Sequence, residues 1–174
     1  MATSFKARLT ADYDKRGFNC SVACEYLVKS GEVFESYGSC RTAPSEYLGL
    51  CSLSNPAQEL IFTFHHADQG AGTYYTIKVA NGRYQGRVLG VTARGYVCTY
   101  EGGEYLWYFV TTGDQFISGD DIRNSRQAVC LKPTSHYKSL EAYGGADYER
   151  SVFWTYLSPT ANGPGLNFYV EFSS

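Results

Sequence analysis

The sequence predicts an all-β fold, and three observations support this: its composition, its strand pattern and an internal repeat. Of its 174 residues, 16 are tyrosines and 18 are glycines. Tyrosine favours half-buried strands, and a high glycine content indicates many turns. Apolar runs of four or five residues alternate with Gly-bearing segments, and no stretch has helical periodicity. We therefore expect a single domain over residues 1–174, built from short strands.

One strand pattern, an apolar run with aromatics two apart, occurs at residues 60–64, 106–109 and 153–156. Its central aromatics, Phe62, Trp107 and Trp154, are spaced 45 and 47 residues apart. Because they lie in the most apolar windows, we expect them to pack in the core. A repeat of this length, with about four strands in each copy, predicts three similar units that share one core.

We place these units at about residues 24–73, 74–115 and 116–172. Residues 1–18 would then be an N-terminal extension, in which residues 5–9 add an edge strand. Within the third unit, residues 116–118 are expected to form a strand that leads into an acidic loop. The segments 100–105 and 143–148 each hold a Gly-Gly pair between two tyrosines, and we expect both to form hairpin loops.

Three four-stranded units, each closing on an aromatic, resemble the β-trefoil superfamily over residues 24–172. The resemblance implies a six-stranded barrel capped by three hairpins with pseudo-threefold symmetry. A β-sandwich or jelly roll remains the alternative, since these folds also use many short strands. In size and loop composition the chain is similar to the soluble fungal-type β-trefoil lectins and protease inhibitors. It lacks the Gln-x-Trp of the ricin-type lectins, because Tyr105 and Val152 stand two residues before the tryptophans.

Known catalytic patterns are not found in the sequence. There is no Gly-x-Ser-x-Gly, and residues 70–72 lack the lysine and the helix of a phosphate-binding loop. His65 and His66 are adjacent, so on a strand they would point to opposite faces and would not share a metal ion. We therefore expect a non-enzymatic binding protein without a cofactor or a metal.

Charge and cysteine content limit the classes of partner and the cellular compartment that we expect. The net charge is −2 and no basic stripe is present, so nucleic acid is not an expected partner. The first 20 residues hold no apolar segment, and no apolar run could span a membrane. We therefore expect a cytoplasmic protein with free, buried thiols at its six cysteines, or a secreted one if a signal was trimmed.

The third unit carries the expected binding site. A sugar is recognised by an aromatic face together with carboxylate, amide and hydroxyl groups. The sequence offers such groups at Asp120, Asp121, Asn124, Tyr137 and Tyr143. We therefore expect carbohydrate recognition, with a glycan or glycoprotein as the partner. The alternative is a protease inhibitor that presents one surface loop, for which residues 37–46, 119–127 and 159–165 are the candidates.

Overall fold

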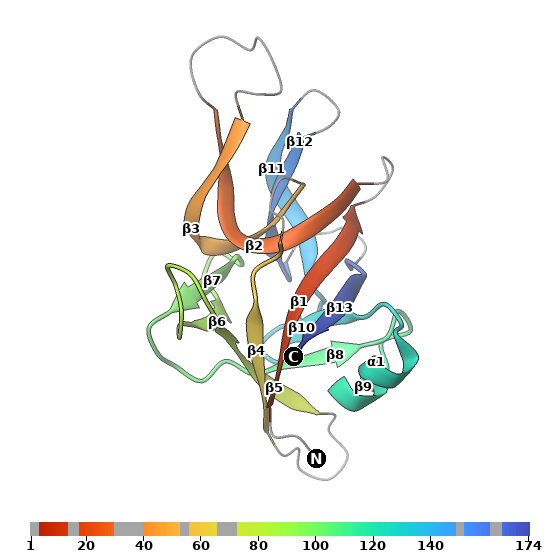
Figure 1. Cartoon of the computed structure of the whole chain (residues 1–174). Coiled ribbons are helices and arrows are strands. Elements are labelled where there is room, and N and C mark those ends of the chain that lie inside the picture. The colour runs from red at the N-terminus through yellow and green to blue at the C-terminus, as the bar shows by residue number, and fades with distance from the viewer. Residues whose placement is uncertain are drawn as a thin grey trace.

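The computed structural model describes residues 4–13, 18–29, 40–52, 56–65, 73–148, 152–160 and 165–174, and it is all-β with one short helix (Figure 1). The first seven strands are β1 (Ser4–Tyr13), β2 (Phe18–Lys29), β3 (Cys40–Cys51), β4 (Leu60–His65), β5 (Tyr74–Val79), β6 (Val88–Val91) and β7 (Val97–Tyr100). They are followed by β8 (Trp107–Val110), β9 (Phe116–Ile117), α1 (Gly119–Ser125), β10 (Cys130–Pro133), β11 (Glu141–Tyr148), β12 (Val152–Ser158) and β13 (Phe168–Ser173).

Seven of the strands close into an antiparallel barrel. Hydrogen-bonded pairing runs from β1 through β2, β3, β7, β6, β5 and β4, and returns to β1. A closed barrel removes the free strand edges that a β-sandwich or jelly roll, the alternative expected from the sequence, would keep, so the pairing favours a barrel. The β2–β3 and β11–β12 hairpins extend from one end of this barrel, and α1 lies toward the other end (Figure 1).

A second closed path joins β1, β4 and β5 to three strands from the C-terminal half of the chain, β8, β10 and β13. β5 pairs with β8 and β8 pairs with β10, while β13 pairs with β1. A single bridge between Val129, the residue before β10, and Phe168 of β13 joins β10 to β13 and completes the path. Its two backbone N–H···O distances are 2.9 and 2.7 Å. The six strands β1, β4, β5, β8, β10 and β13 thus surround one interior.

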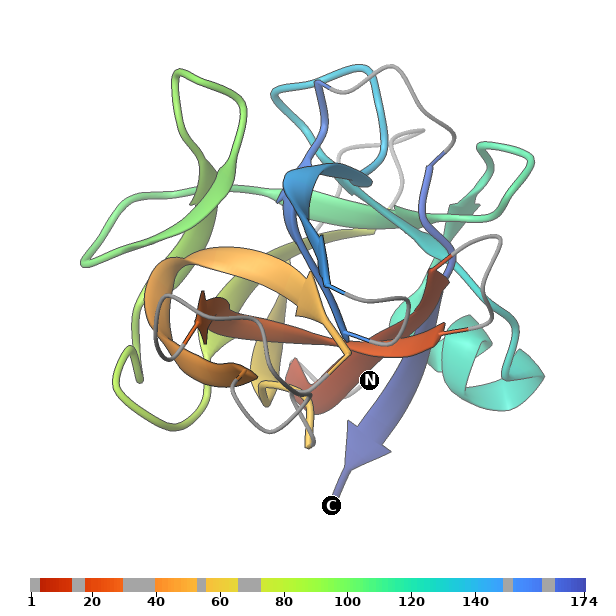
Figure 2. The ribbon, with the colours of Figure 1, turned by 90° about the horizontal axis from the view of Figure 1, so that it is seen from above.

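The expectation of an N-terminal extension with an edge strand is wrong for β1. This strand pairs with β2, β4 and β13, and Figure 2 shows it (red) beside the C-terminal β13 (blue). Ala7, Leu9 and Ala11 are fully buried, in alternation with more exposed neighbours. That period-2 pattern, in the sequence 6-KARLTA-11, is a strand signal, and the small alanines let the strand lie against the crowded interior.

The core is aromatic at its centre. The Phe62 ring of β4 stacks on Phe5 of β1 at a centroid distance of 4.9 Å and contacts Phe109 of β8 at 5.3 Å. Trp107 is 1% exposed, and its indole N–H donates to the Leu89 carbonyl at 2.9 Å. The expectation that Phe62 and Trp107 pack in the core is confirmed. Trp154 is half-buried on β12, where it packs against Leu27 and Cys51 and donates to the Glu25 carbonyl.

The acidic loop expected after residue 118 is instead the helix α1. Ser118 is its N-cap: its hydroxyl accepts from the Asp121 N–H, and the Asp121 carboxylate accepts from the Ser118 N–H. This reciprocal capping box satisfies N–H groups that the first turn of a helix leaves unpaired. Gly119 fits against Phe5, and its N–H donates to the Tyr75 hydroxyl at 2.8 Å. Burial raises the pKa of Tyr75, which keeps this hydroxyl protonated.

Four of the described cysteines, Cys20, Cys24, Cys98 and Cys130, carry free and buried thiols, as expected from the sequence. Burial raises the pKa of Cys20 and of Cys24 to about 12. At neutral pH these two groups are therefore un-ionised thiols, which are poor nucleophiles.

Replacing Trp107 with alanine should lower the free energy of unfolding by about 3–5 kcal/mol, because it leaves a large cavity and removes the hydrogen bond to the Leu89 carbonyl. Urea unfolding followed by circular dichroism measures this loss. Tyr137→Ala is the matched control, since Tyr137 is 99% exposed and its loss should cost less than about 0.5 kcal/mol. A loss below about 1 kcal/mol for Trp107→Ala would contradict the packing described here.

The reactivity of the thiols toward a disulfide reagent should differ sharply between the native and the unfolded protein. At pH 8, Cys20 and Cys24 should resist a disulfide reagent such as dithionitrobenzoate, because at a pKa of about 12 only about one thiol in 10⁴ is ionised. In denaturant without reductant, all six cysteines should react. Fewer than six reactive thiols under that condition would reveal a disulfide and contradict the expectation.

Candidate functional site

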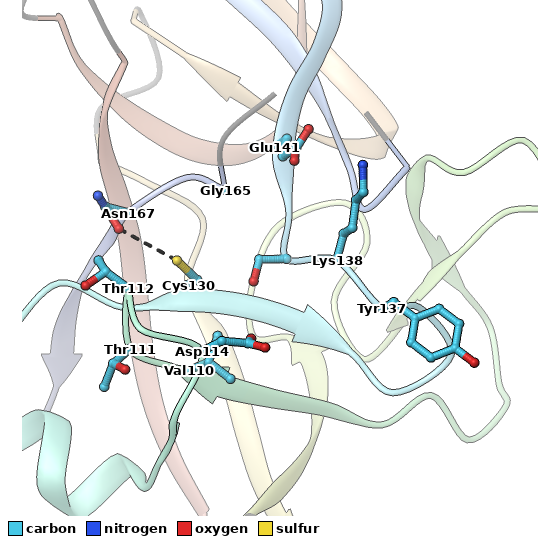
Figure 3. Close-up of a pocket in the computed structure, with 11 residues that line it drawn as sticks. Val110, Thr111, Thr112, Asp114, Cys130, Tyr137, Lys138, Glu141, Gly165 and Asn167 are labelled. Carbon is cyan, nitrogen blue, oxygen red and sulfur yellow. Dashed lines mark hydrogen bonds between the residues drawn. The ribbon is translucent and has the colours of Figure 1, made fainter. Parts of the chain in front are cut away.

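An open polar cavity of about 470 Å³ lies over the outer face of β8 and β10 (Figure 3). Its walls come from three segments far apart in the sequence. These are the turn after β8, the connection between β10 and β11, and residues 165–167 before β13. A volume in this range suits a small molecule, since ligand cavities typically measure about 300–1,000 Å³.

The first wall is the tight turn between β8 and β9, which presents Asp114. Thr111 closes the turn: its N–H donates to the Gln115 carbonyl at 2.8 Å, and its carbonyl accepts from the Asp114 N–H at 3.0 Å. Asp114 has a φ of 59°, a left-handed conformation that aspartate tolerates better than most residues. Its carboxylate lies 3.3 Å from the Lys132 ammonium and is largely exposed, so it can still accept hydrogen bonds from a ligand.

The floor of the cavity is formed where β10 meets the segment before β13. The Cys130 thiol donates to the side-chain oxygen of Asn167 at an S···O distance of 3.7 Å (Figure 3). Burial, with a smaller effect of Asp114, raises the pKa of Cys130, against a hydrogen bond with Ser139 that lowers it. The thiol is therefore neutral and acts as a donor, and it orients the exposed Asn167 amide at the cavity.

The connection between β10 and β11 supplies the remaining wall. It is held at both ends, because the Thr134 N–H donates to the Leu106 carbonyl at 2.9 Å and the Leu140 N–H to the Leu131 carbonyl at 2.8 Å. Between these anchors, Tyr137 and Lys138 are exposed and line the cavity. In Figure 3 the Tyr137 ring projects from the rim, away from Asn167 at the other end of the cavity.

The lining can both donate and accept hydrogen bonds. Asp114 and the buried Glu141 carry carboxylates, Lys138 carries an ammonium, and Asn167 carries an amide. The hydroxyls of Thr111, Thr112 and Ser139 can act in either direction. Two acidic and one basic group, with Lys132 beside Asp114, leave little net charge, so the cavity fits a neutral polyhydroxy ligand better than a strong anion or cation.

The expected site residues lie on three different elements. Asp120, Asp121 and Asn124 are exposed on α1, whose Arg123 side chain lies 4.5 Å over the Phe172 ring of β13. Asp121 serves the capping box there. Of the five expected residues, Tyr137 is the one that lines the cavity.

Tyr143 lies in a different environment from the one expected. The segment around it is strand β11 rather than a hairpin loop, and the Gly-Gly pair coincides with a register shift between Tyr143 and Ala146. Such a bulge inserts extra residues into a strand, which glycine tolerates. The Tyr143 ring packs on Tyr96 at 5.7 Å, within a tyrosine cluster that includes Tyr47 and Tyr156.

Sequence reasoning missed Asp114, Lys138, Glu141 and Asn167. Thr111-Thr112-Gly113-Asp114 reads as a turn, and an aspartate at its end is a signal for a polar exposed loop. Nothing in the sequence places that turn beside Lys138 and Asn167, which come together only when β8, β10 and β13 pair. Within the described ranges, no group of three or more His, Cys, Asp and Glu side chains is arranged to hold a metal ion.

Comparison of the chain with protein-family models, with curated proteins and with solved structures gave no match. A separate observation concerns membranes: in the described part of the chain, no helix has the length and apolar character needed to cross one.

The capping box makes Asp121 a structural residue. Ser118→Ala and Asp121→Ala should each lower the free energy of unfolding by about 0.5–2 kcal/mol, because each removes one half of the reciprocal cap. Urea unfolding of both variants, beside Asn124→Ala as the control on the same helix, measures the effect. If Asn124→Ala costs as much as Asp121→Ala, the loss reflects helix exposure in general and not the cap.

Proposed function

We propose that this protein is a non-enzymatic carbohydrate-binding protein and that the polar cavity over β8 and β10 is its sugar site. The observation that carries the proposal is the gathering of carboxylate, amide and hydroxyl groups in one open cavity, with an exposed tyrosine at one end of its rim. Sugar hydroxyls both donate and accept hydrogen bonds, and the C–H face of a sugar ring packs on an aromatic face. Asn167 and Asp114 would bind hydroxyls, and the exposed Tyr137 would cover the ring after its side chain turns from the rim toward the cavity.

We also infer that the fold is a β-trefoil built on the six-stranded ring of β1, β4, β5, β8, β10 and β13, with units that differ from those expected from the sequence. Each unit would give two strands to the six-stranded ring and one hairpin to its cap: β1 to β4, β5 to β8, and β10 to β13. Three paired hairpins, β2–β3, β6–β7 and β11–β12, support this inference. So does the burial of one apolar side chain on each ring strand, at Leu9, Phe62, Ile77, Phe109, Leu131 and Phe168.

The alternative, protease inhibition through a surface loop, has less support. Residues 119–125 of one candidate loop are helical, and residues 40–46 of another belong to β3, where residues 40–44 pair with β2. Residues 37–39 and 161–164 of the candidate loops lie outside the described residues. An inhibitory loop needs an exposed segment that is free to enter a protease cleft, whereas α1 is helical and residues 40–44 are hydrogen-bonded to β2.

A glycan array followed by calorimetric titration of the strongest monosaccharide tests the proposal. We expect a dissociation constant between micromolar and millimolar, equivalent to about −8 to −4 kcal/mol. Asn167→Ala and Tyr137→Ala should each weaken binding about tenfold or more, because each removes one wall group from the cavity. Both residues are exposed, so neither change should lower the thermal stability appreciably.

Asn124→Ala is the matched control, since it removes a polar group from the originally expected site on α1 without touching the cavity. Its binding should equal that of the wild type. The proposal fails if the array shows no binding, or if binding is lost in Asn124→Ala and retained in both cavity variants. A protease panel run in parallel would identify inhibition as the function in the first of these cases.

A further inference from the structure

We propose that the ligand is an oligosaccharide chain and that an aromatic row beside the cavity, formed by Tyr74, Tyr108 and Phe116, is a second subsite for it. This inference rests on the proposed carbohydrate-binding function and extends the same site. It follows from the register of four neighbouring strands, β5, β8, β9 and β10.

Strand register places the cavity floor and the row on one face. Val110 of β8 pairs with Cys130 of β10 on one side and with Phe116 of β9 on the other. Directly paired residues point to the same side of a sheet, so Phe116 lies on the face that carries the cavity floor. Val110 and Cys130 both line the cavity.

The next outward pair along β8 and β10 is Tyr108 with Lys132. It lies two residues from the pair of Val110 and Cys130, which is about 7 Å along the strands. Trp107 and Tyr75 pair and are buried, so Tyr74 and Tyr108, one residue along in each strand, point outward. Their rings meet at a centroid distance of 5.9 Å, and Tyr108 contacts Phe116 at 4.8 Å.

Lys132 connects the two parts of this surface. Its ammonium lies 3.3 Å from the Asp114 carboxylate at the cavity and 5.7 Å from the centre of the Tyr108 ring in the row. The Lys132 side chain is largely buried between Asp114 and Tyr108, so the cavity and the row adjoin each other. A ligand that fills the cavity can therefore continue directly onto the aromatic rings.

The chemistry of the row selects its occupant. Phe116 is half exposed on a two-residue strand and contributes little to the core, whereas most phenylalanines in proteins are buried. It offers no hydrogen-bonding group, so the row suits a ring with an apolar C–H face. The cavity supplies the hydroxyl-binding groups. A linear oligosaccharide repeats both properties, hydroxyl groups and an apolar ring face, along its chain. A monosaccharide would occupy only the cavity and would not extend to the row.

The test is calorimetric titration with glucose, galactose, mannose and N-acetylglucosamine, each as the mono-, di- and tetrasaccharide. We expect the affinity for the best series to rise at least tenfold from the monosaccharide to the tetrasaccharide. Phe116→Ala should remove most of that rise and leave the monosaccharide affinity unchanged, while Phe116→Trp should retain it. Tyr26→Ala, which removes an exposed ring from the distant β2–β3 hairpin, is the control and should behave as the wild type.

The outcomes separate this inference from the function on which it rests. Failure of every saccharide to bind overturns the carbohydrate-binding function itself. Monosaccharide binding whose affinity does not increase with chain length, or a full increase retained in Phe116→Ala, overturns the second subsite and leaves the cavity as the site. Equal losses in Phe116→Ala and Tyr26→Ala would also overturn it, since they would place the chain elsewhere.

Discussion

The structure depends on the packing of aromatic rings around Phe62, in the interior surrounded by β1, β4, β5, β8, β10 and β13. This ring is fully buried, and its neighbours Phe5, Tyr75 and Phe109 come from β1, β5 and β8. Strand pairing alone fixes only the order of the strands. The contact among four strands fixes which side of each strand faces inward, because a shift of one residue would turn every ring outward.

The outward face follows from the same alternation. Once Trp107 and Phe109 of β8 point to the interior, Tyr108 must point outward, and so must its partner Lys132 on β10. The cavity occupies this outer surface, where the turn at Asp114 and the segment around Asn167 rise above the strands. The outer surface under the candidate site thus follows from the core, because the residues of β8 and β10 that alternate with the buried ones face outward.

The sequence predicted the features that depend on local pattern. The all-β class and the burial of Phe62 and Trp107 followed from alternation and aromatic spacing. α1 was missed because seven residues are too few for helical periodicity, although Ser118 and Asp121 have the spacing of a capping box. The sequence indicates an edge strand at residues 5–9 because nothing in these residues shows that three other strands pair with β1.

The candidate site was predicted only in part, at Tyr137, because its groups are brought together by long-range pairing. Asp114, Lys138 and Asn167 meet through β8, β10 and the bridge between Val129 and Phe168, and one sequence does not reveal that register. A sequence pattern can indicate only groups that are close together along the chain, such as Asp120 and Asp121 in the polar segment after residue 118. Their helix instead packs through Gly119 against Phe5 and Tyr75.

The most direct test of the site is a two-dimensional ¹H–¹⁵N NMR titration of the labelled protein with the saccharide that binds best. The account predicts that the largest shift changes occur in the amides of Asp114, Lys138 and Asn167, which line the cavity on three separate segments. Amides of α1, such as those of Asp120 and Asn124, should shift little. Changes concentrated on α1 or around Tyr143, with the cavity amides unmoved, would contradict it.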